Sequence, residues 1–110
     1  MRGRGLAALA TAILLGGATL PVRAEDVQIG QKGKVFSESA VTLKKGDAIV
    51  FKNDDTVSHN VFSRSDAFRF NLKLQKPGEE KKVVFESAGT VSVRCAIHPS
   101  MELEVTVEEE

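Results

Sequence analysis

The sequence predicts an all-β fold, a Greek-key sandwich or barrel of about seven to eight strands. Short segments in which apolar and polar residues alternate follow one another along the chain after Ala24, and turn-forming residues separate them. Alternation with a period of two is typical of strands that have one buried face. No window of the sequence has the 3.6-residue spacing of an amphipathic helix. Together these observations favour a single all-β domain.

The apolar residues of the first half fall in three short runs, and a turn signal follows each run. Glycine, asparagine and aspartate adopt the backbone conformations that turns require, so each signal predicts the end of a strand. The runs are 27–29 before Gly30, 41–43 before 44–47, and 48–51 before 52–55.

The second half contains the strictest alternation. Four apolar residues at even positions of 68–74 alternate with polar residues, and Pro77-Gly78 follows, so a strand is predicted over 68–74. The remaining apolar runs also predict strands. They lie at 83–85 before Gly89, at 91–95, and at 101–107.

The last two predicted strands carry the sulfur atoms of this region. Residues of equal parity share one face of a strand, so Cys95 lies on the apolar face of Val91 and Val93. By the same rule Met101 lies on the apolar face of residues 103–107. Both sulfurs should therefore point inward at one end of the domain, joined by a short loop that Pro99 stiffens.

Composition excludes several classes of protein. The 110 residues include 15 basic and 15 acidic side chains, for a formal net charge of zero, and one cysteine. A single cysteine excludes an internal disulfide framework and a multi-cysteine zinc site within one chain. The balanced charge argues against a strongly basic nucleic-acid binder. The length suits one ordinary domain.

The N-terminal residues predict export. Arg2 and Arg4 precede an uncharged stretch over 6–20, and Val22-Arg23-Ala24 offers small residues at a cleavage site, so residues 1–24 read as a signal peptide. The uncharged stretch is short for a membrane span of about 20 residues, and a retained anchor is the weaker alternative. Cleavage leaves 25–110 as the domain, 86 residues with 12 basic and 15 acidic side chains and a net charge of −3.

A metal site is predicted from four side chains. Cys95, His98 and Met101 have Cys-x2-His-x2-Met spacing, and His59, the only other histidine, lies 36 residues before the cysteine. Two imidazoles, a thiolate and a weak axial thioether are the ligands of a blue-copper site. Taken singly, each residue has an ordinary alternative: a buried cysteine, a core methionine, or a surface histidine. Their joint occurrence favours copper.

The sequence resembles the cupredoxins, in particular small type I copper proteins of the plastocyanin and amicyanin type. The resemblance covers the whole chain after Ala24. Its motifs are Lys45-Gly46-Asp47, Asn53-Asp54-Asp55, Ser58-His59-Asn60-Val61, Lys76-Pro77-Gly78-Glu79, Gly89, and the segment from Cys95 to Met101. The two-residue gap between His98 and Met101 resembles amicyanin, and cupredoxins of methylamine utilisation, more than plastocyanin.

This resemblance implies a role for each residue of the site. His59, Cys95 and His98 would be equatorial copper ligands, and Met101 the axial ligand. Asn60 would tie the two ligand loops together through hydrogen bonds. One departure concerns the positions before the cysteine, where the family usually has aromatic residues and this sequence has Val93 and Arg94.

The expected function is that of a periplasmic electron carrier whose one copper ion cycles between Cu(I) and Cu(II). A redox donor and an acceptor would dock transiently near His98, on a monomer that binds no nucleic acid and has no membrane span after signal cleavage. Enzyme activity is not expected, because four protein ligands leave no open coordination position. Two alternatives remain: a copper-binding protein for copper tolerance or delivery, and a metal-free β-domain that binds a partner.

Overall fold

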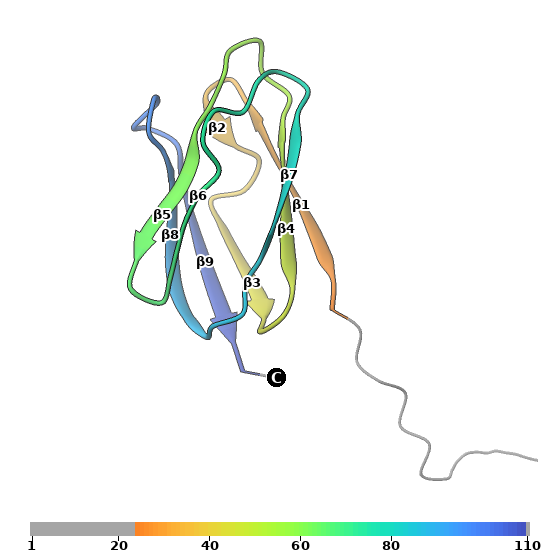
Figure 1. The fold of residues 1–110 in the computed structure, drawn as a ribbon, viewed down its shortest axis with the longest axis vertical. Coiled ribbons are helices and arrows are strands. Elements are labelled where there is room, and N and C mark those ends of the chain that lie inside the picture. Colours follow the sequence, from red (N-terminus) through yellow and green to blue (C-terminus); the bar gives the residue numbers. More distant parts are fainter. Residues whose placement is uncertain (1–23, 110) are drawn as a thin grey trace, which may run out of the picture.

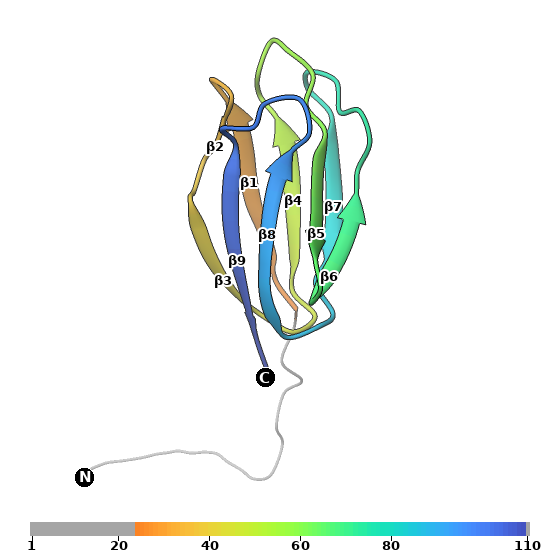
Figure 2. The ribbon, with the colours of Figure 1, turned by 90° about the vertical axis from the view of Figure 1, so that its left-hand side faces the viewer.

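Two β-sheets packed face to face make up the protein (Figures 1 and 2). The structure, a computed structural model, describes residues 24–109. One sheet has the strand order β2-β1-β4-β7 and the other β3-β9-β8-β5-β6. The strands are β1 (Asp26–Lys32), β2 (Val35–Phe36), β3 (Ala40–Lys44), β4 (Ala48–Asn53), β5 (Val61–Ser65), β6 (Phe68–Asn71), β7 (Glu80–Val84), β8 (Gly89–Cys95) and β9 (Glu102–Glu108).

The strand pairings confirm the predicted all-β sandwich. β1 pairs with β4 and β3 with β9 in parallel, and the other pairs are antiparallel. Parallel neighbours cannot be joined by a hairpin, so the chain crosses from one sheet to the other between them. The segments before β5, between β6 and β7, and between β8 and β9 consequently meet at one end of the sandwich (Figure 2).

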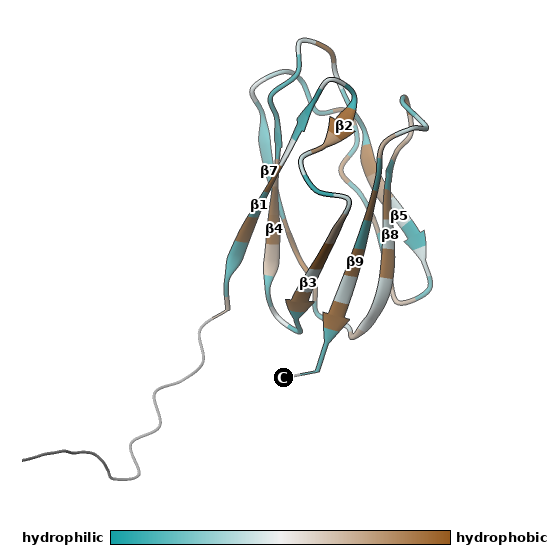
Figure 3. Cartoon of the chain, turned by 180° about the vertical axis from the view of Figure 1, so that it is seen from behind, coloured by the Kyte–Doolittle hydropathy of each residue, from teal (hydrophilic) through white to brown (hydrophobic). Residues whose placement is uncertain are grey.

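The core lies between the two sheets and follows the alternation of the sequence. From Val91 onward the odd-numbered residues of β8 and β9 are buried, and most even-numbered residues of the two strands are exposed. Brown segments therefore alternate with teal or pale segments along β9 in Figure 3. Phe51 and Phe85, with no exposed surface, are the largest buried side chains, and the ring of Phe85 packs edge-on against Phe68 and Phe70. The backbone of Phe85 pairs with the turn between β3 and β4, so this residue lies toward the end of the sandwich opposite the loop between β8 and β9 (Figure 2).

Two details differ from the sequence prediction. The described residues form nine strands rather than seven or eight, because β2, a two-residue strand, and β5 are additional. The predicted strand over 68–74 ends at Asn71. Lys73 has φ of 62°, a left-handed conformation that interrupts a strand, and Leu74 beyond it is 53% exposed. Alternation alone did not reveal this break.

The predicted signal peptide lies outside the described residues, except for Ala24. Within the described part of the chain, no helix has the length and apolar character needed to cross a membrane.

Candidate metal centre

His59 is fixed by its backbone before β5 begins. Its N–H donates to the carbonyl of Gln75 at 3.0 Å, and the N–H of Gln75 donates to the carbonyl of His59 at 2.7 Å. This isolated antiparallel bridge connects the segment before β5 to the segment before β7. The side chain of His59 has no exposed surface. The fold therefore determines where this imidazole points.

Cys95 is the last residue of β8 and pairs with Val61 of β5. The residue is 3% exposed, so its sulfur points inward as the strand parity predicts. The backbone N–H of Asn60 donates to its Sγ at 3.3 Å, and the carbonyl of Asn60 accepts from Ala96 at 2.9 Å. The Asn60 backbone thus joins the two ligand-bearing segments, while its side-chain amide donates to Asn71 at 2.7 Å.

Three donor atoms converge at this end of the sandwich. The Nδ1 atoms of His59 and His98 are 3.0 Å apart, and each is 3.8 Å from Sγ of Cys95. Metal–nitrogen and metal–sulfur bonds of about 2.0 to 2.3 Å to the corners of a triangle separate neighbouring donors by roughly 3.5 to 3.8 Å. Both nitrogen–sulfur distances agree with this range, and the two nitrogens are closer together than it requires. The three side chains form a candidate copper site, because two imidazoles and a thiolate match copper in donor type.

Asp55 determines which ring nitrogen of His59 carries the proton. The carboxylate Oδ2 lies 3.0 Å from Nε2 of His59. A carboxylate accepts, so Nε2 donates its proton and the lone pair of Nδ1 is free to bind a metal. The pKa of Asp55 is lowered to about 2, chiefly because the backbone N–H of Lys34 donates to it, and the contact with His59 lowers it further.

His98 lies on the loop between β8 and β9 and is only partly buried. Burial lowers its pKa below the ordinary value, and the nearby charges of His59 and Lys34 lower it further. A lower pKa favours the neutral imidazole, the form that binds metals. The neighbours of His98 on the loop, Ala96, Ile97 and Pro99, are exposed.

Met101 follows this loop and is fully buried in the apolar core. Its backbone N–H donates to the carbonyl of His98 at 3.0 Å, which closes the loop as a tight turn. The inward direction predicted from parity agrees with this burial. Its role as axial ligand remains a prediction.

A buried polar network lies behind His59 and was not predicted from the sequence. The side chains of Gln31, Asn53 and Gln75 have no exposed surface. Gln31 donates to Gln75 at 3.0 Å, and Asn53 donates to the carbonyls of Val57 and Gln75, each at 2.9 Å. The sequence signal that was available is the Asn-Asp-Asp segment at 53–55, which ends four residues before the histidine.

Comparison with known proteins gives a consistent result. Residues 24–108 match the family described as copper binding proteins, plastocyanin/azurin family. Methylamine utilization protein MauL of Methylorubrum extorquens is 34% identical over 89 residues, which cover 80% of this chain and 78% of MauL. Chloroplastic plastocyanin of Hordeum vulgare is 33% identical over 104 residues, covering 84% of this chain and 65% of the plastocyanin. The crystal structure of amicyanin from Paracoccus versutus superposes with a TM-score of 0.69 at 25% identity and covers 81% of this chain and 85% of amicyanin.

Proposed function

We propose, from the premise that this chain belongs to the plastocyanin/azurin family of copper-binding proteins, that it is a periplasmic one-electron carrier. The proposed ligands of its copper ion are His59, Cys95, His98 and Met101. Bound copper supplies a couple between Cu(I) and Cu(II). The observation that carries the proposal is the convergence of two imidazole nitrogens and one thiol sulfur within 4.8 Å of one another.

The proposed ligands have complementary roles in electron transfer. His59 and Cys95 are held by backbone pairing and burial, so little rearrangement of these residues is needed when the charge of the site changes. The N–H of Asn60 stabilises negative charge on the sulfur of Cys95. The partly exposed ring of His98 gives a short route between the site and the surface.

The surface around His98 suits brief contact with a redox partner. Ala96, Ile97 and Pro99 form an apolar rim, and Ile97 is 48% exposed. A small rim of this kind fits the weak interfaces of electron-transfer complexes. Catalysis is not part of the proposal, because four protein ligands leave no coordination position for a substrate.

Export is part of the same proposal. The positive residues, the uncharged stretch and the small residues of 1–24 support a cleaved signal peptide, with 25–110 as the copper-binding domain. Mass spectrometry of the protein recovered from the periplasm checks this: a chain that begins at Glu25 is expected. A full-length chain in the membrane fraction would support a retained anchor instead.

Copper titration of the purified protein tests the function directly. We expect an intense thiolate-to-copper charge-transfer band in the visible spectrum at one equivalent of copper, and a reversible one-electron wave in voltammetry. The zinc-loaded protein, which has the same ligands but no redox couple, is the control and should give neither signal. Copper binding without a reversible wave would contradict electron transfer. No copper-dependent rise in unfolding temperature would favour a metal-free domain.

A further inference from the structure

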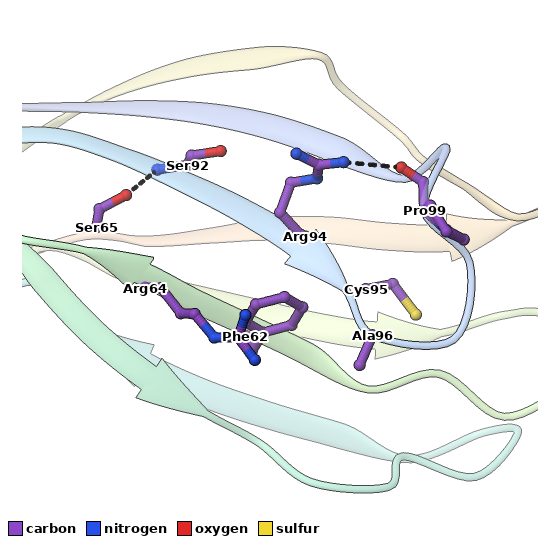
Figure 4. A pocket seen from close by; sticks show the side chains of 8 residues that line it. All are labelled: Phe62, Arg64, Ser65, Ser92, Arg94, Cys95, Ala96 and Pro99. Carbon is purple, nitrogen blue, oxygen red and sulfur yellow. Dashed lines mark hydrogen bonds between the residues drawn. The ribbon is translucent and has the colours of Figure 1, made fainter.

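A groove of about 570 Å³ lies on the outer face of the five-stranded sheet, beside the loop that carries His98 (Figure 4). β5 supplies one wall and β8 the other, and the loop closes one end. The lining residues are Phe62, Arg64, Ser65, Ser92, Arg94, Cys95, Ala96 and Pro99.

The ladder between β5 and β8 ends within the groove. β5 and β8 pair from Val61 to Ser63 on one strand and from Cys95 to Val93 on the other. Beyond this ladder, the N–H of Ser92 donates to Oγ of Ser65 at 2.8 Å (Figure 4). A side chain thus replaces a backbone acceptor, and the hydroxyl proton of Ser65 is free to point into the groove.

Positive charge is concentrated on this face. Arg64 lines the groove, and Arg69 lies directly opposite it on β6. Like charges in directly opposed positions destabilise a sheet. Arg69 pairs with Asp66 at 2.9 Å, but the side chain of Asp66 is 98% exposed, so this pair compensates little. Among the described residues, no ion pair involves Arg64.

The groove offers hydrogen-bond donors without a carboxylate in its lining. Arg64 lies over the ring of Phe62, 5.1 Å from its centroid. Arg94 donates to the carbonyl of Pro99 at 3.0 Å and pairs with Glu102 at 3.3 Å, while its buried Nε has no partner. The lining is therefore suited to an incoming carboxylate, which would approach from the side of β5 and β6, away from Glu102.

We propose that this groove binds a carboxylate-rich segment of the electron-transfer partner and holds it next to Cys95, one of the proposed copper ligands. The partner is identified as a redox protein only through the proposed function, so this inference rests on that proposal. Charge complementarity supports it: the domain over 25–110 carries a net charge of −3, yet this face presents arginines from three neighbouring strands. An acidic partner would approach this face and be repelled by the rest of the surface.

A peptide titration followed by nuclear magnetic resonance tests the groove. The copper(I)-loaded protein is titrated with hexaglutamate in low salt, and hexaglutamine serves as the uncharged control peptide. We expect amide shifts at the groove residues of β5 and β8, and weaker binding as salt increases. Arg64→Gln should weaken hexaglutamate binding about fivefold, the value of one exposed ion pair.

Lys82→Gln is the matched control variant, because it removes one exposed positive charge from β7 of the other sheet. This variant should leave the affinity unchanged. Equal weakening by both variants, or shifts confined to residues outside the groove, would overturn the proposal. Acetate that binds as tightly as hexaglutamate at equal carboxylate concentration would also overturn it, in favour of a simple anion site.

Failure of this inference can be separated from failure of the proposed function. The charge-transfer band and the one-electron wave are recorded on the same samples without peptide. Hexaglutamate binding in the groove of a protein that lacks a reversible wave would contradict the proposed electron carrier and leave a docking surface for acidic segments. A reversible wave without peptide binding would contradict only the groove.

Discussion

The two histidines of the candidate copper site are held in contrasting ways. His59 is fully buried, paired with Gln75 through two backbone hydrogen bonds, and bonded to Asp55 through Nε2. His98 is partly exposed on a short loop, with its carbonyl bonded to the N–H of Met101. One imidazole is thus positioned by long-range contacts of the fold, and the other by the shortness of its loop.

Because the two histidines are held differently, substitutions near each of them should affect different properties of the protein. Changes behind His59 should lower the stability of the protein even without copper, because they disrupt buried hydrogen bonds. Changes on the loop should act on the metal site and leave the metal-free fold nearly intact. The following substitutions test this distinction.

Cys95→Ser should have the largest effect. A hydroxyl replaces the only thiol, so the charge-transfer band should disappear completely. The copper-dependent stabilisation, about 4 kcal/mol when free copper is a thousandfold above its dissociation constant, should be mostly lost. Visible spectroscopy and thermal unfolding with and without copper measure both. Ser100→Ala, an exposed change in the same loop, is the control and should preserve the band.

Asn53→Ala should affect the scaffold more than any change on the loop. Its side chain donates to the carbonyls of Val57 and Gln75 and accepts from the N–H of Asp55, so alanine leaves buried polar groups without partners. We expect a loss of about 3 kcal/mol in the free energy of unfolding of the metal-free protein. Urea unfolding measures this loss.

Asn71→Ala is the control for Asn53→Ala. It also removes an asparagine that accepts two hydrogen bonds, from Asn60 and Lys73, but it lies on the surface. Its cost should be below about 1 kcal/mol, because water replaces the lost partners. Equal losses in the two variants would contradict the assignment of stability to the buried network.

The sequence predicts the loop side of the site better than the His59 side. Cys95 and His98 are three residues apart, so their spacing already brings them together, and strand parity predicts the inward direction of Cys95 and Met101. The bond between Gln31 and Gln75 joins residues 44 positions apart and depends on strand pairing that no local pattern reveals. Most of the buried amide network was therefore inaccessible to sequence reasoning.

The strand that follows His59 was missed for a related reason. β5 has Ser63 at an inward position, so its sequence does not alternate between apolar and polar residues. Ser63 is 3% exposed, and its hydroxyl donates to the carbonyl of Phe68 at 3.0 Å. A buried serine that finds a backbone acceptor is compatible with a core strand, but it hides that strand from a hydropathy pattern.

Asp55→Asn should weaken copper binding and raise the reduction potential of the copper, because Asp55 is bonded to His59. The carboxylate bonded to Nε2 makes the imidazole a better ligand, and it stabilises Cu(II) more than Cu(I) because of its charge. We expect about tenfold weaker binding of Cu(II), and a reduction potential higher by about 59 mV if binding of Cu(I) is unchanged. Voltammetry measures the potential.

Asp54→Asn provides the matched control for this electrostatic effect. Asp54 is the neighbouring acid, but it is 45% exposed and pairs with Lys52. Its removal should change the potential much less, since solvent screens its charge. The same rise in both variants would indicate a general effect of charge rather than the hydrogen bond to His59.

The low pKa of Asp55 predicts how stability depends on pH. A carboxyl whose pKa falls to about 2 on folding stabilises the folded state above its ordinary pKa near 4, and this contribution disappears as the pH falls toward 2. The difference in unfolding free energy between the metal-free wild type and Asp55→Asn should be constant from about pH 7 to 5 and shrink below about pH 4. A difference that stays constant to about pH 2 would contradict this linkage.

Arg94→Gln should have the smallest effect on stability. Its main effect should be on the ordering of the loop that carries His98. Its guanidinium donates to the carbonyl of Pro99 and pairs with Glu102, and both contacts are partly exposed, so the expected loss is below about 1 kcal/mol. The loop amides should nevertheless exchange hydrogen faster, because the bond to Pro99 ties the loop to β8. Glu102→Gln removes the ion pair and leaves that bond, so it should not accelerate exchange. Equal acceleration in both variants would mean that charge, rather than this bond, orders the loop.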